Sequence, residues 1–166
     1  MKKVGYSSLM DGRELPKSDF HFEVLGDLDE CSAAIALARS FIDNAGVTEV
    51  LKTIQKDLSM LMGQVAGAGL EADYLQKRLA WIEALITGLK QSLELPTAFI
   101  LPGGNNNEAL LDNARAISRR AERSFARLAE TTHKDNNAGL QYLNRLSTLL
   151  YLFEIKVGNS TDKAAM

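Results

Sequence analysis

The residues best suited to chemistry are four arginines within nine positions, Arg115, Arg119, Arg120 and Arg123. At about 100° per residue, a helix would place Asp112, Arg115, Arg119, Glu122 and Arg123 within little more than a quarter-turn, with Arg120 along one edge. Arginine is the usual side chain for phosphate, because its planar guanidinium donates two parallel hydrogen bonds. The stripe could therefore hold a polyphosphate. A solvent-exposed face with weak i,i+4 ion pairs has the same pattern, and the charge pattern alone favours this plainer interpretation.

A glycine-containing loop, F-I-L-P-G-G at 99–104, leads directly into the arginine segment. Pro102 fixes one backbone dihedral, whereas Gly103 and Gly104 permit conformations and close approaches that a side chain would block. The loop could be a rigid platform that presents Phe99 to a flat ligand, or a plain connection between helices. Neither a G-x-x-x-x-G-K-[ST] phosphate loop nor a G-x-G-x-x-G motif occurs in the chain, so the glycine pair alone is weak evidence for a nucleotide.

Three acids, Asp27, Asp29 and Glu30, lie early in the first predicted helix. They could simply complement the positive end of the helix dipole. The apolar run at 33–38 indicates a tightly packed surface, and an acid that borders such a surface needs a cationic partner. The arginine segment is the natural source of that partner.

A fourth block, Y-L-N-R-L-S at 142–147, places Asn144 and Arg145 among leucines and a tyrosine. These two polar side chains would destabilise the fold if they were buried without partners. They therefore either face water or reach a partner or ligand, and the sequence leaves both alternatives open.

The apolar periodicity predicts five helices that position these residues, over 19–44, 47–68, 71–93, 105–130 and 136–157. Start signals at Asp19 and at Asn105, which has Glu108 at capping-box spacing, mark two of these helices. We expect segment 1–18 to be extended and residues 158–166 to fray. The pattern predicts an all-α fold, a five-helix antiparallel bundle that forms one domain over 1–166. The buried side of the arginine helix is predicted to consist of Leu110, Ala114, Ile117, Ala121, Phe125 and Leu128.

The overall composition excludes several classes of protein. A net charge of −2 gives no field that would attract nucleic acid or an anionic membrane, so an anion site must come from clustered Lys and Arg. The single cysteine, Cys31, excludes an internal disulfide and fits a reducing compartment. With only two histidines, a His-rich metal site is not expected. No apolar run suits a signal peptide or a membrane span, so the cytoplasm is the expected location.

Together these blocks resemble the ATP:cob(I)alamin adenosyltransferases of the propanediol-utilisation type. The resemblance rests on G-Y-S-S-L-M-D-G-R-E-L-P-K-S-D at 5–19, G-D-L-D-E at 26–30, F-I-L-P-G-G at 99–104, A-R-A-I-S-R-R-A-E-R at 114–123 and Y-L-N-R-L-S at 142–147. The blocks follow the family order over nearly the whole chain, and those at 114–123 and 142–147 are specific to the family.

The resemblance implies a five-helix bundle that assembles as a homotrimer, with an active site at each subunit interface. Such enzymes transfer the 5′-deoxyadenosyl group of ATP to cob(I)alamin, release triphosphate and form adenosylcobalamin. The ligands are then ATP, Mg²⁺ that arrives with the ATP, and the corrinoid. Because Co(I) is itself a strong nucleophile, such an enzyme needs no catalytic base, which agrees with the lack of a Ser/His/Asp or Cys/His set.

The resemblance also implies roles for single residues. The polyphosphate with its Mg²⁺ is assigned to Arg119, Arg120, Glu122 and Arg123, and further nucleotide contacts to Ser7, Ser8, Lys17 and Asn144. The acid–arginine pair across the subunit boundary is assigned to Asp29 and Arg115, which with Arg119 form the catalytic set. Phe99 matches the aromatic residue that displaces the lower axial ligand of the corrinoid.

The sequence departs from the family pattern in two places. Family members carry a T-x-T-G-D-type segment ahead of the Gly5 position, whereas this chain begins Met1-Lys2-Lys3-Val4, so we expect a truncated nucleotide-binding segment. After N-R-L-S, Thr148 and Leu149 replace the usual aspartate and aromatic residue. These departures leave open an alternative, a corrinoid- or nucleotide-binding homologue with a regulatory or assembly role and no catalysis.

Overall fold

The computed structural model describes residues 3–69, 71, 73–98, 100–132 and 137–158. The elements follow in the order β1 (Tyr6–Ser8), β2 (Glu14–Pro16), α1 (Phe20–Phe41), α2 (Ala45–Val65), α3 (Tyr74–Ser92), α4 (Asn106–Thr132) and α5 (Asn137–Val157). The prediction of a five-helix all-α bundle is confirmed, and each predicted helix end lies within a few residues of the observed one.

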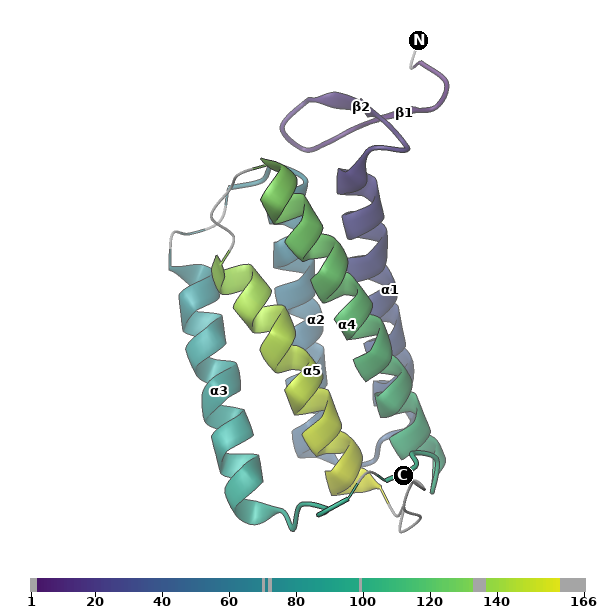
Figure 1. The fold of residues 1–166 in the computed structure, drawn as a ribbon, viewed down its shortest axis with the longest axis vertical. Coiled ribbons are helices and arrows are strands. Elements are labelled where there is room, and N and C mark those ends of the chain that lie inside the picture. Colours follow the sequence, from purple (N-terminus) through teal and green to yellow (C-terminus); the bar gives the residue numbers. More distant parts are fainter. Residues whose placement is uncertain (1–2, 70, 72, 99, 133–136, 159–166) are drawn as a thin grey trace.

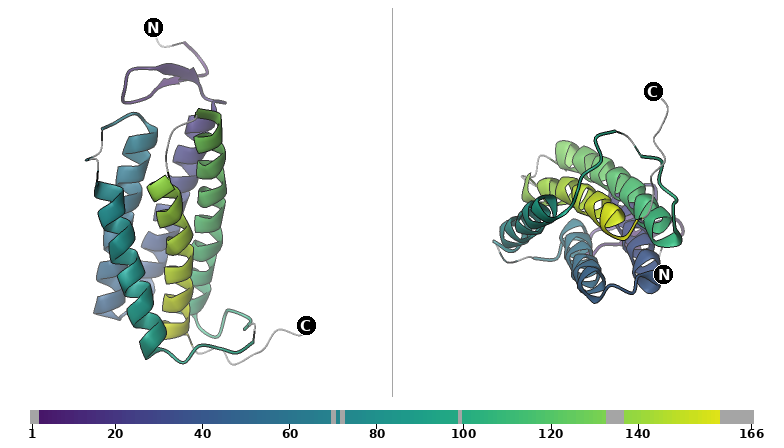
Figure 2. Two further views of the ribbon diagram at one scale, coloured as in Figure 1. Left: turned by 60° about the vertical axis from the view of Figure 1, so that its left-hand side comes forward. Right: turned by 90° about the horizontal axis from the view of Figure 1, so that it is seen from below.

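The helices form two layers, with α3, α5 and α4 in one layer and α2 and α1 in the other (Figure 2). Helix α1 packs against α2 and α4, α4 also packs against α5, and α5 packs against α3. The pairs α1–α2, α1–α4 and α4–α5 are antiparallel, whereas α3 and α5 run in the same direction (Figure 1). This exception arises because the connection after α3 crosses the lower end of the bundle before α4 begins (Figure 1).

The helix starts follow the predicted capping residues. The backbone N–H of His21 donates to Asp19 Oδ1 at the start of α1 (3.0 Å), and that of Glu108 donates to Asn105 Oδ1 at the start of α4 (2.9 Å). Each bond satisfies a donor that the first helical turn leaves unpaired. The Glu108 carboxylate accepts a bond from the backbone N–H of Gly104 (3.1 Å), so it ties the glycine loop to α4.

The N-terminal segment, predicted only to be extended, forms a β-hairpin in which Ser7 pairs with Leu15. The hairpin closes where Leu9 N–H donates to the Arg13 carbonyl (2.9 Å), around a Gly12 with φ of 86°. It is held against the end of α2 by a bond from Met10 N–H to the Ala66 carbonyl (2.8 Å). Strands of three residues are too short to show alternation, so a periodic pattern does not reveal them.

The buried side of α4 differs from its prediction at several positions. Leu110 and Ile117 are only partly buried, whereas Ser118 and Ser124 lie in the core. Both serine hydroxyls donate to the backbone carbonyl three residues earlier, Ser118 to Arg115 (2.8 Å) and Ser124 to Ala121 (3.1 Å). Because the helix itself satisfies these hydroxyls, they can be buried at little expense.

A buried carboxylate joins α3 to the rest of the bundle. Asp57 on α2 is 2% exposed and accepts hydrogen bonds from Tyr142 on α5 (2.6 Å), Tyr74 (2.9 Å) and Arg78 (2.8 Å) on α3. Burial and the Asp57 carboxylate raise the pKa of Tyr74 to about 12, and they also raise that of Tyr142, so both phenols remain donors at neutral pH. No motif in the sequence marks this network.

Candidate functional site

The polar residues of α4 lie on two different flanks of that helix. Glu122 faces α5, where its Oε1 accepts a hydrogen bond from the side-chain amide of Asn144 (2.8 Å). Arg120 faces α1, where its Nε lies 3.2 Å from Asp27 Oδ1 and its Nη2 pairs with Glu30. The arginines are therefore not one continuous row, because Arg119 and Arg120 differ by about 100° around the helix axis.

The flank between α4 and α5 brings together two of the sequence blocks. Asn144 and Glu122 are 22 residues apart in the chain and share a hydrogen bond at the surface. Arg119 and Arg123, one turn apart on α4, are both exposed. A guanidinium, a carboxylate and an amide on one solvent-facing flank supply the donors and the oxygen ligand that a metal-bound phosphate chain requires.

The flank between α1 and α4 holds Arg120 in ion pairs. The hydrogen bond to Glu30 and the charges of Glu30 and Asp27 raise the pKa of Arg120. The third acid of this block, Asp29, is exposed. The predicted need of the acidic block for a cation from the arginine helix is thus met within one chain by Arg120, whereas the pair of Asp29 with Arg115, predicted between subunits, stays a prediction.

Arg115 lies at the lower part of the α4–α5 flank, surrounded by carboxylates. Its Nε donates to Asp112 Oδ1 (3.0 Å) and lies 3.8 Å from Glu154 Oε2. Glu154 is nearly buried, with a side chain 10% exposed. Burial, and then the charge of Asp112, raise the pKa of Glu154 to about 7, although Arg115 opposes the shift; the Glu108 charge adds to it. Glu154 could not be predicted from the sequence, because a glutamate near a helix end carries no distinctive signal.

The N-terminal residues assigned to the nucleotide lie on the hairpin or directly after it. Ser7 is half-buried, whereas Ser8 and Lys17 are exposed. The backbone N–H of Lys17 donates to the Gly5 carbonyl (2.7 Å), which closes the base of the hairpin. The hairpin lies beyond the upper end of the bundle (Figure 1). The side chains of Ser7, Ser8 and Lys17 therefore belong to a segment separate from the α4–α5 flank.

The residue assigned to the corrinoid, Phe99, lies outside the described residues. The loop residues that follow it are described, and Gly103 has a φ of 122°, a conformation that a side chain would strain. The loop end is fixed by Glu108 and by the amide of Asn105, which donates to the Val157 carbonyl (2.9 Å). Of the two positions that depart from the family pattern, Thr148 is half-buried and Leu149 lies in the core.

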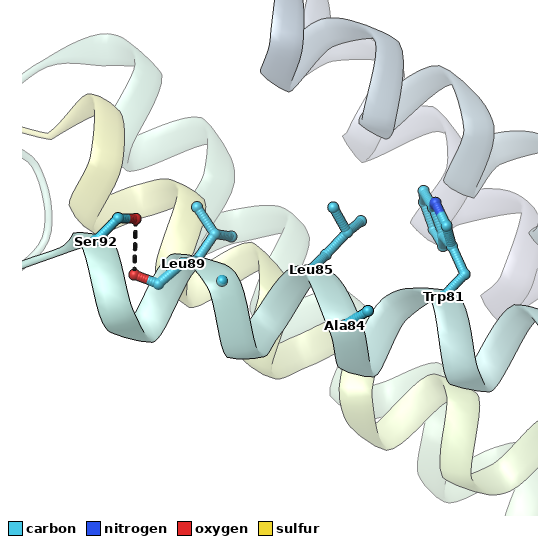
Figure 3. A pocket seen from close by; sticks show the side chains of 6 residues that line it. Trp81, Ala84, Leu85, Leu89 and Ser92 are labelled. Atoms are coloured by element: carbon cyan, nitrogen blue, oxygen red, sulfur yellow. Dashed lines mark hydrogen bonds between the residues drawn. The ribbon is translucent and has the colours of Figure 1, made fainter.

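An apolar groove lies elsewhere, along α3. It is lined by Trp81, Ala84, Leu85, Gly88, Leu89 and Ser92 (Figure 3). Its one lining hydroxyl, that of Ser92, donates to the Leu89 carbonyl (3.2 Å). Because α5 lies between α3 and α4 in their layer, this groove is remote from the arginines of α4 (Figure 2).

Among the residues that the structure describes, no helix combines the length and the apolar character that a membrane span requires. No group of three or more His, Cys, Asp or Glu side chains among the same residues could hold a metal ion.

By architecture the protein is a five-helix bundle with a terminal hairpin and a polar α4–α5 flank. It belongs to the cobalamin adenosyltransferase family, whose model matches residues 2–157.

Named relatives support this assignment. The corrinoid adenosyltransferase MMAB of Bos taurus is 35% identical over 163 residues, which cover 89% of this chain and 65% of that protein. The corrinoid adenosyltransferase of Mycobacterium tuberculosis is 35% identical over an alignment of 167 residues. This alignment covers 89% of this chain and 81% of that protein. The chain spans 62–66% of the length of the mammalian relatives.

Solved structures share the fold. A variant PduO-type ATP:corrinoid adenosyltransferase from Lactobacillus reuteri, complexed with cobalamin and ATP, superposes with a TM-score of 0.82 at 24% identity. The match covers 97% of this chain and 94% of that chain. A second variant, complexed with ATP, has a TM-score of 0.83 at the same identity. This similarity is one of fold.

Proposed function

We propose that the protein transfers the 5′-deoxyadenosyl group of ATP to cob(I)alamin and releases triphosphate, at sites shared between the subunits of a homotrimer. Membership of the family supports the reaction. The observation that carries the proposal is the hydrogen bond between Glu122 and Asn144, because it unites the two most specific sequence blocks on one solvent-facing flank beside Arg119.

In the proposed reaction the cobalt of the reduced corrinoid attacks C5′ of ATP. The Co–C bond forms as the C5′–O5′ bond breaks, and the electron pair of the broken bond leaves with triphosphate. The protein therefore has to bind and orient the two substrates and to stabilise the leaving group. We assign the leaving triphosphate to Arg119 and Arg123, with Ser7, Ser8 and Lys17 as further nucleotide contacts.

Mg²⁺ would be held mainly by phosphate oxygens and would neutralise charge on the leaving group. The Glu122 carboxylate is the oxygen donor that the α4–α5 flank offers to such an ion, and Asn144 orients it. The family resemblance assigns Arg120 to the triphosphate as well. In one chain Arg120 faces α1 and pairs with Asp27 and Glu30, so its contact with the triphosphate requires the ligand to displace those acids.

A homotrimer is supported by an exposed stripe on α1. Asp29, Ala33, Leu37 and Phe41 are spaced by four residues and are all exposed, Leu37 to 49% and Phe41 to 53%. Large apolar side chains in such a row mark an interaction surface. We propose that a second copy covers this stripe, that Asp29 pairs with Arg115 across the boundary, and that Phe99 contacts the corrinoid.

A reduced, buried Cys31 agrees with a cytoplasmic location.

The reaction is tested by incubating the protein with ATP, Mg²⁺ and chemically reduced cobalamin, and following the light-sensitive adenosyl product by absorbance. We expect Arg119→Ala to lower kcat/KM by about 100-fold or more, since it removes a charge-stabilising donor. Lys52→Ala, which removes an exposed cation from α2, should keep wild-type activity. Helicity measured by circular dichroism should be the same in both variants.

The outcomes separate the alternatives. Product formation that is unimpaired in Arg119→Ala would refute the triphosphate assignment. An absence of product from the wild-type protein, combined with calorimetric binding of ATP or cobalamin, would support the non-catalytic homologue instead. Light scattering that gives the mass of one chain at micromolar concentration would refute the trimer.

A further inference from the structure

Several carboxylates converge on one guanidinium at the lower α4–α5 flank. Arg115 donates to Asp112 (3.0 Å) and lies 3.8 Å from Glu154 Oε2, and Glu108 is close enough for its charge to act on Glu154. Glu154 is 8% exposed, and its Oε2 is buried without a hydrogen-bond partner. One positive charge thus faces three acids in a partly desolvated site.

Such a site does not favour three ionised carboxylates. Desolvation disfavours each charged form, and like charges at short range disfavour it further. Asp112 is already hydrogen-bonded to Arg115, and Glu108 accepts a bond from Gly104. Glu154, whose Oε2 lies beyond hydrogen-bond distance of Arg115, is therefore the carboxyl group with most to gain from a proton.

The proposed trimer adds a further acid to this cluster. If Asp29 of a second copy pairs with Arg115, one guanidinium is shared among more carboxylates, because a fourth negative charge joins Glu108, Asp112 and Glu154. We propose that docking of Asp29 of a second copy on Arg115 is coupled to protonation of Glu154, so that Glu154 makes subunit assembly pH-dependent. This inference rests on the proposed trimer but not on catalysis.

The other charged groups around Glu154 are consistent with this assignment. Those that act on its charge, Glu108, Asp112 and Arg115, all belong to α4. Helix α3 packs on another side of α5, where Arg145, nine residues before Glu154, pairs with Glu83 (3.3 Å). Glu83 therefore offers a matched control, an ion-paired glutamate that lies outside the cluster.

The test measures the association constant of the full chain between about pH 6 and pH 9 by fluorescence-detected sedimentation, from nanomolar to micromolar protein. We expect association to weaken as the pH rises above about 7, by about tenfold per pH unit for each proton that must be taken up. Glu154→Gln, which is neutral at every pH, should remove this slope and keep the strong association seen at low pH. Glu83→Gln should keep the wild-type slope.

Each outcome bears on a different statement. A trimer whose association does not change with pH, or a slope that persists in Glu154→Gln, overturns the role of Glu154 and leaves the proposed function intact. A protein that stays monomeric at every pH overturns the trimer as well. Asp29→Asn offers an independent check, because it should weaken association and flatten the slope while Glu154 is unchanged.

Discussion

The buried carboxylate of Asp57 offers the most direct test of how this bundle is held together. It is 2% exposed and accepts hydrogen bonds from two phenols and one guanidinium on two other helices. Asp57→Ala would leave the Tyr142 hydroxyl, on a residue with 0% exposure, without its acceptor. It would also remove the carboxylate from Arg78, whose side chain is 19% exposed.

The size of the loss follows from these two groups. A buried donor left unsatisfied destabilises a protein by about 1–3 kcal/mol, and breaking one side of a buried ion pair by about 3–5 kcal/mol. The part of Arg78 that reaches water moderates the second figure, so we expect a loss of about 3–5 kcal/mol in total. Asp57→Asn, which retains one acceptor oxygen, should lose less. Because domains are stable by only about 5–15 kcal/mol, the change is readily measured.

The assay is equilibrium urea unfolding followed by circular dichroism, at two protein concentrations so that any contribution from assembly is separated. Asp73→Ala is the control, because Asp73 lies next to α3 in an exposed ion pair with Lys77, and such pairs contribute little to stability. A loss below about 1 kcal/mol in Asp57→Ala would refute the reasoning. So would a Tyr142→Phe substitution that is as costly after Asp57 has been replaced as before.

Three further predictions follow from single residues. Gly67→Ala should destabilise the hairpin attachment by about 1 kcal/mol or more, because φ is +90° and the new Cβ would clash with the Asp11 carboxylate. Urea unfolding measures this loss, and an unchanged midpoint would contradict it. Cys31 has 0% exposure, and burial raises its pKa to about 12. It should therefore react with a disulfide reagent at pH 8 about a thousandfold more slowly than a free thiol, and fast labelling of the native protein would contradict this. The pKa of Glu154 is about 7 in the folded chain, compared with an ordinary value of 4.5. The folded chain therefore holds the extra proton, and the free energy of unfolding falls as the pH rises from about 4.5 to 7. Glu154→Gln should then be more stable than wild type at pH 8 by up to about 3 kcal/mol, measured at one protein concentration, and equal stability would exclude the shift.

Several features could be predicted because they are local. Helix positions follow from apolar periodicity, and the α1 and α4 starts follow from Asp19 and Asn105, whose side chains bond the first turn of their own helices. The sequence blocks predicted the family without any contact map. Each of these inferences depends on residues that are close in the chain or on motifs that stand in a fixed order.

The hairpin and the serines of α4 were missed for physical reasons. The strands Tyr6–Ser8 and Glu14–Pro16 are stabilised by pairing with each other and by a contact with Ala66, some fifty residues away, so their own pattern is weak. Ser118 and Ser124 are polar in sequence, yet their hydroxyls bond the helix backbone and can enter the core.

The sequence by itself determined the number of helices, their approximate bounds and the family, because helical periodicity and motif order are properties of the chain alone. Only the tertiary structure decided which helix covers each flank of α4. Arg120 therefore meets the acids of α1 while Glu122 meets Asn144 on α5, although the two residues are close neighbours in sequence. The partners of Asp57 and Glu154 were also decided there, since periodicity shows that a side is buried but not what it is buried against.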